Sequence, residues 1–453
     1  MSSALLAAWS KTLRRHGAAQ AVVQAADGRT ATFREIDAGA RAWRAACVPP
    51  GADVRGRRVL FAVSNGIEWF EIFLGLLQAG AVAVPLDPGE PPAAREALAL
   101  ALGAAWLWDG AALQPRPGRR RHVDPRVCLL KLTSGSTGAP RPLAFSDGQL
   151  LADGRQIRAT MKFGPRDSNY ALIPFGHSYG LGNLVIPLIA AGVPIVTGSA
   201  PLPHAIAADF KRWQPTVFPG VPVMWRALTA AAVTLPGLRL AISAGAPLAP
   251  ATAAEFFAQN GQRIHGFYGS SETGGIAYDP TGRAALAGGV GRAMKGVRLT
   301  VGRGGRLGVS SAAVLTAGNP RRRGKLGLWL MPDRARVDGR GNVTLLGRRG
   351  STVKISGRRV TLAEIESIFR QVEGVRDVWI GVRETPEVQL GAAVVSTQTV
   401  AEVRTELQTR LAAWKIPKRI VVLASLPHTG RGKIDSQALQ ALVFGESKPT
   451  RAG

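Results

Sequence analysis

Val59-Leu60-Phe61-Ala62-Val63 and Ala81-Val82-Ala83-Val84-Pro85 are two short apolar runs that flank a segment with helical spacing. In that segment, residues 68–77, apolar side chains recur with the period of a helix. Short runs rich in valine are typical of buried strands. A strand, a helix and a second strand in this order predict two parallel strands with the helix packed across them.

The same alternation continues along the chain. Residues 184–191 have helical spacing and precede a strand-like run at 193–196, and a strand-like run at 238–243 precedes a helical stretch at 251–259. Repeated strand–helix–strand units build parallel sheets that helices cover. The sequence therefore predicts an α/β fold.

The length of the chain and a change in its residue pattern indicate two domains. A chain of 453 residues is longer than one hydrophobic core usually supports. Short segments broken by Gly, Arg and Pro fill residues 288–327 and predict a β-rich subregion. A boundary is expected at residues 347–351, before a strand, a helix, two strands and a helix. We therefore expect a large N-terminal domain of α/β sheets at residues 1–347 and a small, mobile C-terminal α+β domain at residues 348–453.

The net charge of +27, from 57 basic and 30 acidic residues, has two interpretations. Arginines scattered over a solvated surface need no partner, whereas a functional excess of charge attracts a polyanion, an acidic membrane face or an acidic carrier protein. Nucleic-acid binding is not expected, because aromatic residues, on which bases stack, make up only 6% of the chain. The choice between a scattered charge and an acidic partner stays open.

The cysteines and the longest apolar stretch indicate the compartment. Cys47 and Cys128 lie in apolar runs without metal-ligand or redox spacing, so buried structural roles are expected for both. Residues 180–198 are apolar but contain Pro187 and Pro194, a pattern that favours a buried helix followed by a strand. The sequence therefore predicts a cytoplasmic protein without an integral membrane span.

The segment Thr133-Ser134-Gly135-Ser136-Thr137-Gly138-Ala139-Pro140-Arg141 follows an apolar run and is the richest local pattern in the chain. Glycines allow close backbone approach, and hydroxyls together with backbone N–H groups bind phosphate oxygens well. Arg141 adds a cation that can form two hydrogen bonds with a phosphate. The Gly-Lys-Ser/Thr of a Walker loop is missing, so these residues alone leave a phosphate loop and an ordinary polar turn equally open.

This segment resembles the phosphate loop of the adenylate-forming superfamily, which comprises acyl-CoA synthetases, peptide synthetase adenylation domains and luciferases. The chain departs from the family pattern at Arg141, where lysine is usual, and at Pro142, where glycine is usual. The charge is kept at the first position, whereas proline stiffens the loop at the second. The resemblance implies that the phosphates of ATP bind to Thr133, Ser134, Gly135, Ser136, Thr137, Gly138 and Arg141.

Residues 173–180 resemble the Pro-x-Phe-His-x-x-Gly segment that lines the acyl pocket in the same family. The resemblance implies that Gly176 and His177, together with Gly269, line the pocket for the acid. A neutral histidine at a pocket wall can pack against the substrate or gate its entry. Without the neighbouring motifs, His177 would be interpreted as a core histidine with satisfied hydrogen bonds.

Two further segments resemble the family's nucleotide motifs. The turn Gly245-Ala246-Pro247 resembles the glycine-rich turn that lies along the adenine, and residues 266–273 resemble the Tyr-Gly-x-Thr-Glu motif. The resemblance implies that Tyr268 and the adjoining Gly269 contact the purine. Ser271 stands where threonine is usual and offers a hydroxyl to the α-phosphate, and Glu272 offers a hard oxygen ligand for Mg²⁺.

The remaining residues that are predicted to bind the nucleotide, and the predicted hinge, lie near the predicted domain boundary. Asp333 and Arg348 match family positions that bind the ribose and the phosphates, although the Thr-Gly that usually precedes the aspartate is missing. The resemblance places the hinge at residues 348–351, where Gly350 replaces the usual aspartate. It also implies that Gly357 lines the tunnel for the thiol arm once the C-terminal domain rotates.

Lys433 lies in Gly432-Lys433-Ile434-Asp435, which resembles the family's motif near the C-terminus. Attack of a carboxylate on the α-phosphate brings two anions together, so a flexible lysine stabilises the transition state more than the separated reactants. The resemblance assigns catalytic roles to Lys433, Glu272, Ser271 and Thr133, with ATP and Mg²⁺ as cofactors. It implies activation of a carboxylic acid to an acyl-adenylate and transfer to a thiol.

The sequence leaves more than one possibility for the thiol acceptor and for the acid substrate. CoA is the expected acceptor, and the phosphopantetheine of an acidic acyl carrier protein is the alternative, since both kinds of ligase share every motif. A non-catalytic nucleotide-binding homologue is a further alternative, which the presence of Lys433 and Glu272 disfavours. The segment around His177 lacks the aspartate that holds an amino acid's α-amino group, so a fatty or aryl acid is expected.

Overall fold

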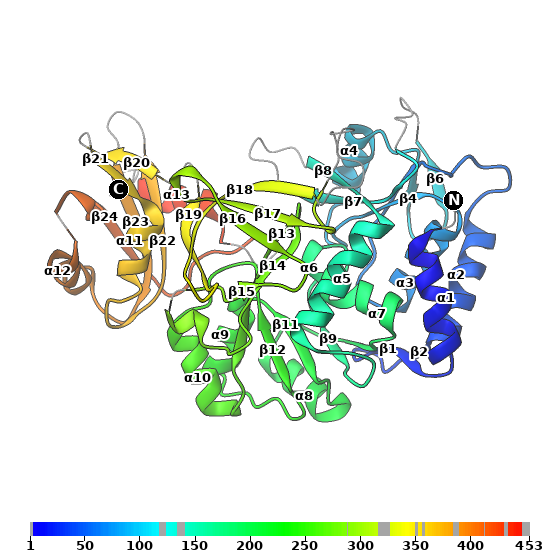
Figure 1. Ribbon diagram of the computed structural model, residues 1–453, viewed down its shortest axis with the longest axis horizontal. Coiled ribbons are helices and arrows are strands. Elements are labelled where there is room, and N and C mark those ends of the chain that lie inside the picture. The colour runs from blue at the N-terminus through cyan, green and yellow to red at the C-terminus, as the bar shows by residue number, and fades with distance from the viewer. Residues whose placement is uncertain are drawn as a thin grey trace, which may run out of the picture.

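A computed structural model describes residues 3–116, 124–133, 141–287, 289–315, 327–348, 352–355, 358–383, 389–411, 413–429 and 434–445. It has a large N-terminal domain built on several sheets and a small C-terminal domain at the opposite end of the molecule from the N-terminus (Figure 1). The predicted fold class is confirmed. The positions of residues 349–351, where the hinge is predicted, lie outside the described residues.

The larger sheet of the N-terminal domain is mostly parallel. Within the described residues its strand order is β15-β14-β13-β12-β11-β9-β10-β1-β2. The strands are β1 (Gln20–Gln24), β2 (Thr30–Thr32), β9 (Asn169–Ala171), β10 (Ile195–Thr197), β11 (Val217–Gly220), β12 (Leu240–Ser243), β13 (Ile264–Ser270), β14 (Gly274–Tyr278) and β15 (Arg292–Ala293). The neighbouring strands β1, β10, β9, β11, β12 and β13 run parallel to one another. Strand β14 runs antiparallel to β13.

The second sheet contains the strand–helix–strand unit that the sequence predicts. Its strands, in the order β6-β5-β3-β4-β7-β8, are β3 (Arg58–Phe61), β4 (Val82–Pro85), β5 (Trp106–Trp108), β6 (Leu113–Pro115), β7 (Val127–Thr133) and β8 (Arg141–Ser146). Strands β3 and β4 are parallel and are joined by the buried helix α3 (Ile67–Gln78). The prediction made from the two apolar runs is therefore confirmed.

Helices fill the space between the two sheets and cover their outer faces (Figure 1). They are α1 (Ala4–His16), α2 (Phe33–Cys47), α4 (Pro92–Leu102), α5 (Asp147–Met161), α6 (Ser178–Gly180), the π-helical η1 (Leu181–Val185), α7 (Ile186–Ala191), α8 (Pro203–Trp213), α9 (Pro222–Ala230) and α10 (Pro250–Asn260). The apolar stretch 180–198 forms α6, η1, α7 and β10, as predicted. Among the described residues, no helix is long and apolar enough to cross a membrane.

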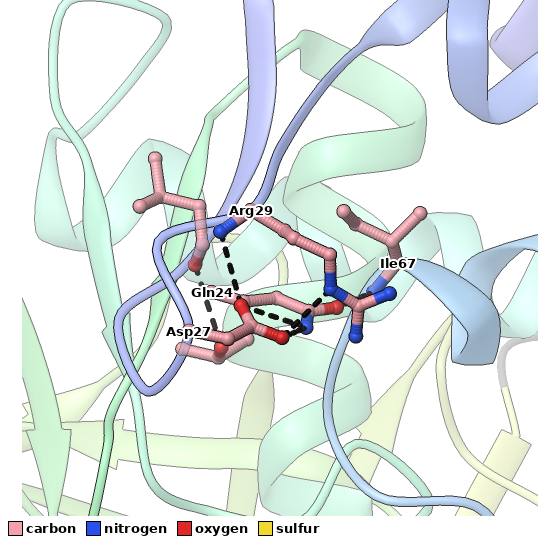
Figure 2. A network of polar contacts seen from close by, with 6 residues as sticks. Gln24, Asp27, Arg29 and Ile67 are labelled. Carbon is pink, nitrogen blue, oxygen red and sulfur yellow. Dashed lines mark hydrogen bonds and ion pairs between the residues drawn. The ribbon is translucent and has the colours of Figure 1, made fainter.

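One core joins the two sheets, and a polar cluster ties their edges together. The core combines Val22 and Ile195 of the larger sheet with Val59 and Leu129 of the second sheet. At one edge, Gln24 of β1 accepts a hydrogen bond of 2.9 Å from the backbone N–H of Ile67, the first residue of α3 (Figure 2). The side chain of Gln24 thereby satisfies a helix N–H that would otherwise lack a partner, because the N-cap of α3 is a glycine.

Gln24 is itself held in place by the loop that follows β1. Its amide donates to Asp27 at 3.1 Å, and Asp27 also accepts from the guanidinium of Arg29 at 2.7 Å (Figure 2). The backbone N–H of Arg29, which donates to Asp27 at 3.0 Å, lowers the pKa of Asp27 most, and the Arg29 guanidinium and the Gln24 amide add to this effect. The cluster therefore keeps the Gln24 carbonyl aimed at α3.

The β-rich subregion and the C-terminal domain follow the predicted order with shifted bounds. The four-stranded subregion consists of β16 (Arg298–Val301), β17 (Arg306–Ser311), β18 (Gly327–Val337) and β19 (Val343–Arg348), so it extends beyond the predicted range 288–327. The C-terminal elements are β20 (Thr352–Ile355), β21 (Arg358–Thr361), α11 (Leu362–Phe369), β22 (Val375–Arg383), β23 (Gln389–Ser396), α12 (Val400–Arg410), β24 (Arg419–Leu423) and α13 (Ser436–Phe444). The sequence patterns did not predict β21, β24 or α13.

An ion pair connects the two domains. The guanidinium of Arg226 on α9 lies 2.7 Å from the carboxylate of Asp377 on β22, and both side chains are partly buried, with 30% and 21% of their surfaces exposed. Removing part of the hydration shell strengthens such a pair relative to one on an open surface. A rotation of the C-terminal domain away from α9 would have to break it.

We expect Arg226→Ala to shift the C-terminal domain away from this orientation, because about 1 kcal/mol of attraction is lost. The distance distribution between fluorophores placed on the two domains should broaden, and Asp377→Ala should have the same effect. Exchanging the charges, R226D with D377R, should restore the narrow distribution. Unchanged distributions in both single variants would show that the pair does not hold the domain.

Candidate active site

Three of the predicted motifs begin or continue where strands of the two large sheets end. Parallel strands carry binding loops at their carboxyl ends. Strand β7 ends at Thr133, β12 ends at Ser243, and β13 ends at Ser270 just before the turn that contains Ser271 and Glu272. The sequence motifs therefore fall on the loops at which an α/β fold usually binds ligands.

The turn between β13 and β14 is tightly constrained. The hydroxyls of Ser270 and Thr273 lie 3.0 Å apart, and the backbone carbonyl of Glu272 accepts a hydrogen bond of 2.8 Å from Leu315. Gly274 has a φ of 70°, a conformation that residues with a side chain rarely adopt. These constraints fix the backbone that carries Ser271 and Glu272.

A buried lysine lies next to this turn. Lys131 of β7 is only 3% exposed, and its ammonium lies 4.1 Å from the centre of the Phe145 ring. Burial lowers the pKa of Lys131, and the negative charges of Asp153 and Glu272 oppose that shift. Both carboxylates therefore favour the charged form of Lys131.

Asp153 is the second buried charge. It lies on α5, is 4% exposed, and accepts a hydrogen bond of 2.9 Å from the backbone N–H of Gly275 on β14. Burial raises the pKa of Asp153, while Lys131 and the Gly275 N–H act in the opposite direction. A side chain at Gly274 would collide with the Asp153 carboxylate, so the turn packs directly against it.

Tyr268 and Asp333 come together although they lie far apart in the sequence. The Tyr268 hydroxyl donates a hydrogen bond of 2.9 Å to Asp333, which is 8% exposed. Asp333 on β18 is also the backbone partner of Arg348 on β19. The structure thus brings Tyr268 into contact with Asp333 and pairs Asp333 with Arg348 on the neighbouring strands β18 and β19; these are the three residues for which the sequence predicts contacts with adenine, ribose and phosphates.

The turn after β12 has the backbone freedom that its motif requires. Gly245 has a φ of 91°, and Gly245, Ala246 and Pro247 are exposed. Just before them, the buried hydroxyl of Ser243 has no hydrogen-bond partner among the described residues. A buried hydroxyl without a partner is costly, so this atom is suited to bind a ligand.

The segment predicted to line the acyl pocket is held by Asn65. Its side-chain amide donates a hydrogen bond of 2.8 Å to the carbonyl of Ile173, and its carbonyl accepts one of 2.8 Å from the N–H of Phe175. Asn65 comes just before α3, so the segment is attached to the helix between the two sheets. The sequence analysis assigned no role to this asparagine.

Gly176 and His177 line a small cavity of about 50 Å³ that opens to solvent. The cavity is also lined by Pro85, Asp87, Glu90, Leu86, Leu98, Leu132 and Pro174. A Cβ on Gly176 would lie 2.8 Å from the Cβ of Pro85, so this glycine permits close packing against the end of β4. This close packing gives Gly176 a steric role at the end of β4.

Several predicted site residues lie outside the described part of the chain. They are Ser134, Gly135, Ser136, Thr137, Gly138, Gly350, Gly357 and Lys433. The backbones of Thr133 and Arg141 are described, and the two residues are antiparallel partners in β7 and β8. Gly269 lies on β13, where a Cβ would approach the carbonyl of Gly274 to 2.8 Å.

Comparison with known proteins identifies the family. A model of AMP-binding enzymes matches residues 9–119 and 103–306, and a model of the C-terminal domain of AMP-binding enzymes matches residues 364–433. The chain belongs to the AMP-binding enzyme family. The prediction that the chain is an enzyme and the predicted membership of the adenylate-forming superfamily are both confirmed. The two matches extend over both domains of this AMP-binding enzyme.

Relatives and solved structures agree with this assignment. Feruloyl-CoA synthase from Amycolatopsis sp is 29% identical over 446 residues, covering 86% of this chain and 89% of the relative. Anthranilate–CoA ligase from Pseudomonas aeruginosa is 26% identical over 353 residues, covering 71% of this chain and 68% of the relative. The crystal structure of ATP-bound MatB from Rhodopseudomonas palustris has a TM-score of 0.84 at 22% identity and covers 98% of this chain and 99% of that one. The last similarity shows that the two folds are alike.

The residues present fit a nucleotide with Mg²⁺. Among the described residues, no three His, Cys, Asp or Glu side chains gather as a metal cluster. Mg²⁺ bound with nucleotides usually needs only one or two carboxylates, because phosphates and water supply the other ligands. The half-buried Glu272, on the turn between β13 and β14, meets this requirement.

We expect Asn65→Ala to weaken binding of the acid, because the segment 173–177 loses both side-chain hydrogen bonds that hold it. The KM for the acid should rise about tenfold, whereas the KM for ATP should change little. Gln24→Ala is the matched control, since it loses the hydrogen bond to α3 without touching this segment. Equal effects of the two variants on the KM for the acid would contradict a positioning role for Asn65.

Proposed function

We propose that this AMP-binding enzyme is an AMP-forming acid–thiol ligase. In the first half-reaction, a carboxylate oxygen of the acid attacks the α-phosphorus of ATP, the bond to pyrophosphate breaks, and an acyl-adenylate forms. In the second half-reaction, a thiolate attacks the acyl carbon, the bond to AMP breaks, and a thioester forms. The observation that carries this proposal is the turn between β13 and β14, in which hydrogen bonds of Ser270, Thr273 and the Glu272 carbonyl fix the backbone that carries Ser271 and Glu272.

The nucleotide is proposed to lie across the ends of β12, β13 and β18. Tyr268 contacts the purine and is kept in place by its hydrogen bond to Asp333. The turn Gly245-Ala246-Pro247 lies along the adenine, and Arg348 reaches the ribose or the phosphates. Mg²⁺ at Glu272 neutralises charge on the phosphates when it is bound.

Residues of the phosphate loop and of the C-terminal domain act on the reacting groups. Thr133, Arg141 and the loop between them hold the phosphates, and Ser271 donates to the α-phosphate. Lys433 contributes a positive charge as the carboxylate approaches the phosphate, which favours the transition state over the separated reactants. No side chain forms a covalent intermediate, so the enzyme acts through positioning and electrostatics.

The second half-reaction is proposed to follow rotation of the C-terminal domain. The rotation occurs at residues 348–351 and brings Gly357 toward the path of the thiol arm. The ion pair between Arg226 and Asp377 lies across the interface that such a rotation must open. Its energy is small enough for the two orientations to interconvert.

A fatty or aryl acid is the proposed substrate class. The segment 173–177 has no aspartate to hold an amino group, and its glycine and histidine line the cavity next to Leu132 and Pro174. Two relatives are named for aryl acids, feruloyl and anthranilate. These observations favour an aryl acid over an amino acid.

CoA is the proposed acceptor, and a carrier-protein phosphopantetheine is the second candidate. The names of the two relatives above include CoA. The net charge of +27 favours the carrier protein, because an acidic partner would be attracted to a basic surface. The proposed location is the cytoplasm, where ATP and CoA are available.

The central experiment is a panel of aryl, fatty and amino acids assayed for pyrophosphate release with ATP and Mg²⁺. We expect release that depends on an aryl or fatty acid and not on amino acids. Thioester yield is then compared with CoA and with phosphopantetheinylated carrier proteins. Nucleotide binding without release for any acid would favour the non-catalytic alternative.

Lys433→Ala should abolish acid-dependent pyrophosphate exchange and spare thioester formation from a pre-made acyl-adenylate. The reason is that the lysine charge is needed while the carboxylate attacks the phosphate and not while the thiol attacks the adenylate. Lys418→Ala, an exposed lysine of the same domain, is the control. Unchanged exchange in Lys433→Ala would overturn the role given to this lysine.

A further inference from the structure

A buried hydroxyl at the end of β12 has no role in the mechanism described so far. Ser243 is 4% exposed, and its Oγ has no hydrogen-bond partner in the described part of the chain. Most buried hydroxyls in proteins have a partner, because burying one without a hydrogen bond costs free energy. A ligand can supply the missing bond if the hydroxyl reaches the nucleotide site.

Ser243 stands between two glycines on the neighbouring strands. Gly220 of β11 and Gly266 of β13 are its register partners, so all three residues face the same side of the sheet. Two residues earlier on β11 and β13, the same side carries the buried side chains of Phe218 and Ile264. The sheet is therefore filled up to the row of Ser243, where the serine contributes the one side chain of the three residues.

The space beside the serine is closed on one side and open on the other. The indole of Trp225 on α9 covers Gly220, where a Cβ would lie 3.0 Å from the ring. A Cβ on Gly266 would have the Cβ of Asp279, at 3.9 Å, as its nearest described neighbour outside the adjoining residues, and Gly266 is partly exposed. Rotation about the Cα–Cβ bond moves a serine hydroxyl among three staggered positions. The hydroxyl of Ser243 can therefore turn toward the open space over Gly266.

This open space adjoins the residues that are proposed to bind the purine. Gly266 lies two residues before Tyr268 on β13, so both residues face the same side of the strand. Gly245, which begins the turn proposed to lie along the adenine, follows Ser243 by two residues. A purine that contacts both Tyr268 and this turn has one edge over Gly266 and beside Ser243.

We propose that Ser243 is a further nucleotide-binding residue, whose Oγ accepts a hydrogen bond from the exocyclic 6-amino group of adenine. The amine projects from the ring and carries two N–H donors, and a serine hydroxyl has lone pairs that accept them. The glycine at position 266 leaves the amine room to approach. This inference rests on the proposed function, since it places the purine of ATP against Tyr268.

The experiment compares two nucleotides that differ in the 6-amino group. Binding of ATP and of purine riboside 5′-triphosphate, which lacks this amine, is measured by calorimetry on the full chain with Mg²⁺ and without an acid. Ser243→Ala should reduce the preference for ATP over the analogue about fivefold, because one hydrogen bond to the amine is lost. The affinity for the analogue should stay that of the wild type. Ser310→Ala, on β17, is the matched control and should keep the wild-type preference.

The melting temperature of the nucleotide-free protein separates binding from a structural role. Ser243→Ala removes a buried hydroxyl that has no partner among the described residues, so its melting temperature should equal or exceed that of the wild type. An unchanged preference, or an equal loss of affinity for both nucleotides, would overturn the inference. A wild type that binds ATP but releases no pyrophosphate with any acid would instead defeat the proposed function, and the preference for the amine would still be measured.

Discussion

The buried carboxylate of Asp153 is the constraint on which the arrangement of the site depends. Its helix, α5, packs against β8 of one large sheet and β14 of the other. The carboxylate accepts a hydrogen bond from β14 and attracts Lys131 on β7. A buried charge must be compensated from fixed directions, so the two sheets cannot shift past one another without exposing it or leaving it unpaired. The strand that enters the phosphate loop and the turn that carries Glu272 are thereby held in register.

Much of the fold could be predicted from the sequence because its signals are local. The valine-rich runs at 59–63 and 81–85 and the helical spacing between them predict a parallel strand pair, and the structure contains it. The motifs also fall at strand ends, where loops can approach a ligand. Strand β24 and helix α13 were missed, because periodicity in short segments near a chain end is weak.

The supporting residues of the site could not be predicted in the same way. Asn65 holds residues 173–175 across more than a hundred positions of sequence, and no local pattern records such a contact. Lys131 and Asp153 interrupt apolar faces, which signals a buried charge but does not name its partner. Gly176 belongs to a motif that could be found in the sequence, but its steric role could not. Only the folded chain shows that Gly176 packs against Pro85.

In the proposed first half-reaction, a carboxylate oxygen of the acid attacks the α-phosphorus of ATP at this site. The most direct test labels both carboxylate oxygens of the acid with ¹⁸O and follows one complete turnover to the thioester by mass spectrometry. The account predicts that one labelled oxygen appears in AMP, because the bond between the acyl carbon and that oxygen breaks when the thiol attacks. Label in inorganic phosphate or pyrophosphate, with unlabelled AMP, would contradict it.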